Sequence, residues 1–200
     1  MVNKRLCGAA FALVLAMGGL APGAGAADRG GDYAVRGAGS RKCQEYVEAV
    51  EQNKPELGAY IAYIDGTLTA YNRLTPNVFD VSPFILPGPF AAIVMNICKQ
   101  ASDRMLEVAL TSAIGALSKV RVAQPSPVLE MTVGENRMSL RAETLRAVQT
   151  RLKSLNLMQG NPDGRFGRPT EDALKRFQQQ NRLAVTGLPD PDTVIALLAR

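Results

Sequence analysis

The side chains that most often carry acid–base and metal chemistry in proteins are scarce in this sequence. Its 200 residues contain no histidine and three cysteines, Cys7, Cys43 and Cys98. Because imidazole is the usual general base and metal ligand near neutral pH, histidine-based triads and histidine-containing zinc sites are excluded. Three cysteines are also too few for a four-thiolate metal site. The sequence therefore predicts no metal and no cofactor.

Glutamates are the remaining candidates for catalysis, because burial can raise the pKa of a carboxyl group enough for it to act as a general acid. Those available in the middle of the chain are Glu45, Glu48, Glu51, Glu56 and Glu107. None of them lies in a recognisable catalytic motif. Solvent-exposed carboxylates on helices are the simpler interpretation, and we predict no catalytic residue and no enzyme activity.

The N-terminal residues have the pattern of a secretory signal peptide. Lys4 and Arg5 precede an uncharged, largely apolar stretch, Leu6–Ala27, which ends in small residues that suit cleavage. We predict a signal peptide over residues 1–26, whose removal also removes Cys7 and leaves the mature chain periplasmic or secreted, with no membrane association. An uncleaved anchor is the alternative, because 22 uncharged residues could just span a bilayer.

The two cysteines of the mature chain, Cys43 and Cys98, are predicted to form a disulfide. Paired thiols usually oxidise in the compartment that a signal peptide implies. Bridging positions 55 residues apart restricts the unfolded chain by about 4 kcal/mol on the loop-entropy model. Two separately buried free thiols are the alternative, and the absence of C-x-x-C spacing argues against a redox role.

The spacing of apolar residues predicts a helical domain over residues 40–120, with a proline-rich loop at 75–89. Its four helices are expected at 43–50, 57–71, 90–98 and 102–117. The following segment, 121–139, contains two prolines and a glycine and is interpreted as a linker. A short strand over Leu129–Val133 is left open as the alternative.

Three further helices are predicted between residues 140 and 200, so the fold class is all-α. Apolar positions in 145–155 mark the first, and an Asn-Pro-Asp-Gly turn follows it at 161–164. Pro169 and Pro191 suit the first turns of the other two helices.

An internal repeat is also visible in this region. Asp163 precedes the helix start Thr170–Leu174, and Asp190 precedes Thr193–Leu197; both helix starts read Thr-x-x-Ala-Leu. Two such matches within 35 residues suggest a repeated turn-plus-helix unit.

The ordered motifs of this region resemble a known family. They are Val148-Gln149-x-Arg151-Leu152, Asp163-Gly164-x-Phe166-Gly167-x-x-Thr170, Ala173-Leu174-x-x-Phe177-Gln178, Leu183-x-x-Thr186-Gly187 and Asp190-x-x-Thr193. Together they are similar to the three-helix peptidoglycan-binding module that is often appended to cell-wall hydrolases. The resemblance implies a module over residues 140–200 that binds peptidoglycan without catalysis. The alternative is a module that retains only the fold.

The candidate peptidoglycan-binding residues are Asn161, Asp163, Arg165, Arg168, Thr170 and Gln178. A basic, amide-bearing rim suits peptidoglycan because its stem peptides carry carboxylates. Asp163 and Thr170 are also expected to form hydrogen bonds at the turn and at the helix start. Gln149 and Gln178 either brace the loops or reach the ligand, and the residues alone do not decide between the two.

The charge distribution agrees with an anionic partner for the C-terminal module. The net charge of the chain is +5, and residues 140–200 hold ten basic and six acidic residues. The excess is small and no basic run is present, which argues against a nucleic-acid partner.

The middle domain also shows a resemblance, carried by Cys43, Cys98 and the helical segment 60–72. It is similar to the disulfide-bonded helical superfamily that includes periplasmic acid-stress chaperones and periplasmic immunity proteins. That resemblance implies binding to a periplasmic protein through residues 40–120. We therefore expect a non-catalytic, cell-wall-associated adaptor, with an immunity or chaperone-like protein localised by the wall module as the alternative and a cell-wall hydrolase as a weaker one.

Overall fold

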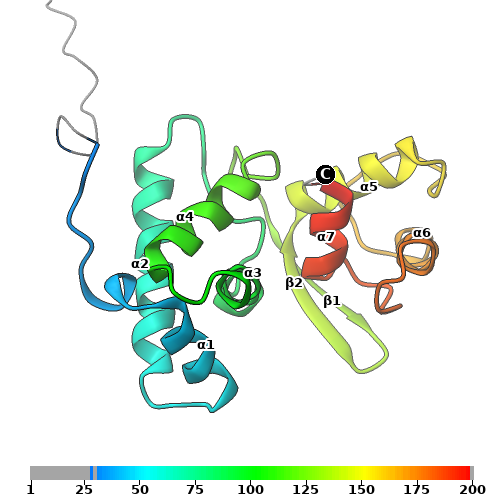
Figure 1. The fold of residues 1–200 in the computed structure, drawn as a ribbon. Coiled ribbons are helices and arrows are strands. Elements are labelled where there is room, and N and C mark those ends of the chain that lie inside the picture. Colours follow the sequence, from blue (N-terminus) through cyan, green and yellow to red (C-terminus); the bar gives the residue numbers. More distant parts are fainter. Residues whose placement is uncertain (1–27, 29–30, 199–200) are drawn as a thin grey trace, which may run out of the picture. The chain divides into compact units, whose positions relative to one another are not determined.

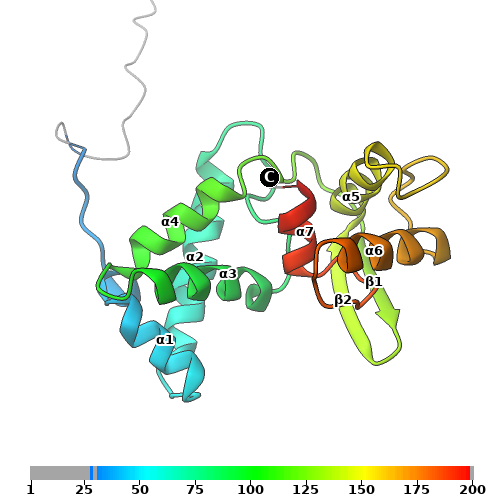
Figure 2. The ribbon, with the colours of Figure 1, turned by 45° about the vertical axis from the view of Figure 1, so that its right-hand side comes forward.

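The computed structural model describes Asp28 and residues 31–198. The predicted signal peptide at residues 1–26, and Cys7 within it, lie outside the described residues. The described part of Val35–Arg200 belongs to one compact unit. Its elements are described below in chain order (Figures 1 and 2).

Four helices follow a single 3-10 turn at Gly37–Ser40. They are α1 (Cys43–Glu51), α2 (Leu57–Leu74), α3 (Pro87–Gln100) and α4 (Leu106–Ala116). Their buried faces repeat at helical spacing, and their largest fully buried side chains are Tyr46, Ile64, Phe90, Leu106 and Leu110. The four helices predicted between residues 40 and 120 are confirmed, with ends that shift by a few residues.

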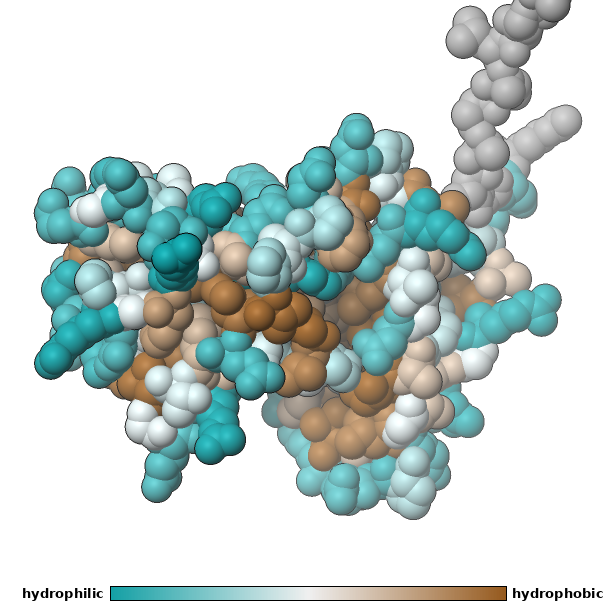
Figure 3. All heavy atoms as spheres, turned by 180° about the vertical axis from the view of Figure 1, so that it is seen from behind, coloured by the Kyte–Doolittle hydropathy of each residue, from teal (hydrophilic) through white to brown (hydrophobic). Residues whose placement is uncertain are grey.

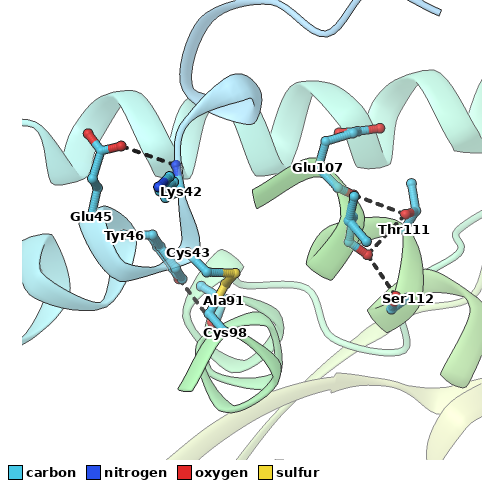
Figure 4. The surroundings of a disulfide bond; sticks show 10 residues. Lys42, Cys43, Glu45, Tyr46, Ala91, Cys98, Glu107, Thr111 and Ser112 are labelled. Atoms are coloured by element: carbon cyan, nitrogen blue, oxygen red, sulfur yellow. Dashed lines mark hydrogen bonds between the residues drawn. A yellow bond between two sulfur atoms is a disulfide. The ribbon is translucent and has the colours of Figure 1, made fainter. Parts of the chain in front are cut away.

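The predicted disulfide is present between Cys43 and Cys98. Cys43 begins α1 and Cys98 lies near the end of α3, with their Cα atoms 4.8 Å apart and both side chains fully buried. Beside the bridge, the Tyr46 hydroxyl donates a hydrogen bond to the carbonyl oxygen of Ala91 at 2.9 Å (Figure 4). The disulfide therefore links α1 and α3, two helices that already share a core, as expected of a structural disulfide.

The last three helices are α5 (Ala142–Ser154), α6 (Arg168–Gln180) and α7 (Pro191–Leu198). Each buries one apolar stripe, and the stripes meet in a core that includes Leu145, Val148, Leu152, Leu174 and Leu197. A proline occupies the first turn of α6 and of α7, as the sequence predicts.

The structure differs from the all-α prediction in the segment 121–139. Here β1 (Val128–Val133) pairs antiparallel with β2 (Asn136–Arg141), and Met131 lies opposite Met138. Gly134, at φ +60°, supplies the left-handed conformation that this tight turn requires. The short strand over Leu129–Val133 that the sequence left open is therefore present as β1. Met131 and Leu140 are buried in the hydrophobic core, so the segment is packed structure and not the linker that the sequence predicts.

Hydrophobic side chains also reach the surface. In the described residues, the exposed large hydrophobics are Tyr33, Leu74, Phe79, Leu86, Met105, Val128, Leu155 and Val185. Figure 3 shows hydrophobic residues gathered in a band across one face of the molecule. In the described part of the chain, no helix combines the length and apolar character needed to cross a membrane.

Candidate functional site

Most of the candidate residues lie on the connection between α5 and α6 or on the first turn of α6. Asn161, Asp163 and Arg165 lie on the connection, and Arg168 is the first residue of α6. All four side chains are exposed. They therefore form a polar, basic loop surface. The geometry of this surface depends on the contacts that hold the loop in place.

The loop is held by one buried amide, that of Gln149 on α5. Gln149 Nε2 donates to Asp163 Oδ1 at 3.1 Å, to the Arg165 carbonyl oxygen at 2.9 Å and to Thr170 Oγ1 at 3.1 Å. Its Oε1 accepts the backbone N–H of Gly164 at 2.7 Å. Since Gln149 is only 1% exposed, its role is to brace the loop, and it does not reach a ligand.

Gln178 on α6 holds the connection between α6 and α7 in the same way. Its Nε2 donates to Thr186 Oγ1 at 3.0 Å, to the Leu188 carbonyl oxygen at 2.9 Å and to Thr193 Oγ1 at 2.9 Å. Its Oε1 accepts the backbone N–H of Gly187 at 2.8 Å. The α5–α6 and α6–α7 connections are thus two copies of one arrangement.

The glycines of the two copies correspond closely. Gly164 and Gly187 both have φ +71°, and each is followed six residues later by the threonine that the glutamine contacts, Thr170 or Thr193. A Cβ atom at Gly164 would lie 2.7 Å from the carbonyl oxygen of Ala142. Positive φ and close approach both require glycine at this position.

The structure also corrects how the repeat aligns. Asp163 corresponds to Thr186, because each side-chain oxygen accepts the N–H of the residue two positions on, at 2.9 Å from Arg165 N and at 3.2 Å from Leu188 N. Asp190, which the sequence paired with Asp163, instead accepts the N–H of Thr193 at the start of α7. The repeat is real, but its matching positions are set by the glycines.

Two of the predicted contact residues are buried. Gln178 is 0% exposed and Thr170 is 2% exposed. Of the two roles left open for Gln178, its burial supports bracing, because its amide holds the α6–α7 connection. Thr170 acts at the helix start, where its hydroxyl accepts from Gln149.

Comparison with known proteins bears on this region. Residues 141–197 match a family model described as a putative peptidoglycan binding domain. The match confirms the resemblance drawn from the sequence motifs and supports a peptidoglycan-binding role. No curated protein and no solved structure matches the chain.

The region that matches this family model, residues 141–197, carries a fixed negative charge within its basic loop. Two hydrogen bonds to the Asp163 carboxylate, first from the N–H of Arg165 and then from the Gln149 amide, hold its pKa below the usual range. Asp163 therefore stays ionised at neutral pH and shapes the loop, while Arg165 and Arg168 extend beside it into solvent.

The glutamates considered as catalysts are placed as structural or surface groups. Ion pairs with Arg41 and Lys54 keep the pKa values of Glu45 and Glu48 below their ordinary value, which is the opposite of what a general acid needs. Glu107 is buried and accepts a hydrogen bond from the Tyr63 hydroxyl at 2.8 Å. Within the described residues, no group of three or more His, Cys, Asp or Glu side chains could hold a metal ion.

Proposed function

We propose that this protein is a non-catalytic, periplasmic or secreted adaptor that binds peptidoglycan through residues 140–200 and holds a helical domain, residues 40–120, at the cell wall. The observation that carries the proposal is the match of residues 141–197 to the peptidoglycan-binding family. The domain boundaries 40–120 and 140–200 are part of the proposal.

The exposed α5–α6 loop is the proposed contact surface. Arg165 and Arg168 offer guanidinium groups, and Asn161 offers an amide, to the carboxylates of peptidoglycan. The buried Gln149 fixes the loop before ligand arrives, so little conformational entropy is lost on binding.

For the helical domain we propose a protein partner. Leu74, Phe79 and Leu86, all near the α2–α3 connection, are 69%, 39% and 57% exposed. A contiguous exposed apolar patch is typical of a protein-binding surface, and these three side chains are the proposed members of such a patch. An immunity protein and an acid-stress chaperone are two forms of this proposal. Inhibition of a wall hydrolase supports the first, and suppressed aggregation at low pH supports the second.

Binding to purified sacculi tests the proposed function. The full mature chain is expected to sediment with sacculi, and the double variant Arg165→Glu/Arg168→Glu is expected to lose at least tenfold in affinity. The matched control Arg137→Glu/Lys153→Glu changes the net charge equally at two exposed positions outside the loop and should bind as the unaltered chain does.

Two outcomes would contradict the proposal. If the unaltered chain does not sediment with sacculi, the domain has kept the fold without the binding. If the full chain releases soluble fragments from peptidoglycan, and a glutamate substitution abolishes the release, the protein is an enzyme.

A further inference from the structure

A groove of about 910 Å³ runs along the solvent-facing side of α5. One wall is the segment Gln124–Pro127, and the floor and other wall are residues of α5 at helical spacing, opposite the buried stripe of that helix. Its volume lies within the range of sites that bind small ligands, about 300–1,000 Å³. Because Gln124–Pro127 precedes the family match, this wall of the groove lies outside the region that the family model covers.

The wall of the groove is fixed to α5 by hydrogen bonds. The Pro127 carbonyl oxygen accepts the N–H of Ala142 at 2.9 Å, and Ser126 Oγ accepts the N–H of Glu143 at 3.2 Å. The Glu143 carboxylate in turn accepts the N–H of Gln124 at 3.3 Å. The groove is therefore preformed, and its one carboxylate is engaged with the backbone.

The lining combines small apolar groups with two cations. Pro125, Pro127 and Ala147 present apolar surface, and Arg146 and Arg151 are exposed along the same side of α5. Arg146 donates to the Asp163 carbonyl oxygen at 3.4 Å, and Arg151 donates through Nε to a carbonyl oxygen of α7 at 3.2 Å. A guanidinium has five N–H donors, so each contact leaves donors for a ligand.

These observations point to one occupant. We propose that the groove binds the stem peptide of peptidoglycan, with methyl groups of the peptide on Pro125, Pro127 and Ala147 and its carboxylates on Arg146 and Arg151. The Arg146 contact to Asp163 makes the groove continuous with the α5–α6 loop, so one polymer strand can occupy both. The inference rests on the proposed function and adds the class of ligand and the subsite.

The test uses the full mature chain and two soluble probes, a disaccharide carrying a stem peptide with free carboxylates and a glycan strand stripped of its peptides. The peptide-bearing probe is expected to shift the amide resonances of Ala147 and Gln124, and the stripped glycan is not. The variant Ala147→Trp fills the groove from an exposed position and should weaken binding of the peptide-bearing probe at least tenfold. Ala62→Trp, exposed on α2, is the matched control and should leave binding unchanged.

The outcomes separate this inference from the proposed function. A chain that does not bind sacculi refutes both. A chain that binds sacculi overturns the groove alone if it prefers the stripped glycan, if its shifts are confined to residues 161–168, or if Ala147→Trp binds the peptide-bearing probe unchanged. Circular dichroism of Ala147→Trp establishes that its fold is retained, and Arg151→Glu, expected to weaken the same probe at least fivefold, gives a second test without added bulk.

Discussion

Replacing Gln149 by leucine tests whether one buried amide organises the loop of the peptidoglycan-binding domain. Leucine has a similar size and keeps the apolar packing, but it removes all four hydrogen bonds of the Gln149 side chain. The N–H of Gly164 and the hydroxyl of Thr170 are buried and lose their partner. The Arg165 carbonyl oxygen lies on an exposed residue, so water can replace its lost contact.

The magnitude follows from the two buried groups. Each buried donor or acceptor left without a partner costs about 1–3 kcal/mol, and better apolar burial of leucine offsets part of that sum. We expect Gln149→Leu to lower the free energy of unfolding by about 2–4 kcal/mol. Gln178→Leu should cost at least as much, because its partners Gly187, Leu188 and Thr193 are all buried.

Urea unfolding followed by far-UV circular dichroism measures the loss, and amide hydrogen exchange locates it. The N–H of Gly164 should lose protection in Gln149→Leu, and the N–H of Gly187 should lose protection in Gln178→Leu. Gln179→Leu, at an exposed neighbouring position, is the control and should stay within about 0.5 kcal/mol. Losses below that value in both variants would refute the bracing role, as would lost sacculus binding in Gln149→Leu with unchanged stability.

Three further predictions concern the disulfide of the helical domain and the α5–α6 and α6–α7 connections. Replacing Cys43 and Cys98 together by alanine should lower the free energy of unfolding by about 4 kcal/mol, measured in urea, and a loss below about 1 kcal/mol would contradict a stabilising bridge. The pKa of Asp163 in the folded chain lies below its ordinary value of 3.8, so its contribution to stability is complete above pH 3.8 and is lost as the pH falls through the folded pKa. Asp163→Asn should therefore flatten this part of the stability–pH profile. An unchanged profile would assign the acid sensitivity to other groups. Gly164→Ala should destabilise more than Gly187→Ala, since the new Cβ meets backbone at the first position and a flexible lysine side chain at the second, and thermal unfolding that ranks them in reverse would refute the steric argument.

Helical periodicity of the apolar residues predicted most of the fold, but it did not predict the hairpin of β1 and β2. In β2 only Met138 and Leu140 are apolar, and the strand begins and ends with polar or charged residues. Two prolines just before β1 also favour an irregular segment. Burial of Met131 and Leu140 and the backbone pairing of Leu140 with Phe84, which is distant in sequence, support the hairpin, and local patterns do not encode either.

The sequence predicted where the candidate site lies, but not which of its residues are exposed for contact. The family motifs located the α5–α6 loop, but residue type misplaced Gln178, because glutamine is mostly exposed in proteins. A better signal was present: Gly164 and Gly187 each precede a threonine by six residues, whereas the aspartates used for the comparison precede theirs by seven and three. Equal spacing from glycine reports a shared backbone turn, which is what the two glutamines hold.

Contacts between the end of β2 and the α2–α3 connection would fix how the proposed adaptor presents its helical domain. The Arg141 guanidinium lies 4.8 Å from the ring centroid of Phe79, with Nη2 3.8 Å from Asp80 Oδ2, and its Nη1 donates to the Ser126 carbonyl oxygen at 3.3 Å. Backbone pairing of Phe84 with Leu140 adds a second tie between the α2–α3 connection and β2. A flexible tether would let the exposed side chains near that connection face any direction, whereas these contacts hold them in one orientation to the peptidoglycan-binding domain. Under the proposed function, these contacts would position the partner at the wall as well as retain it there.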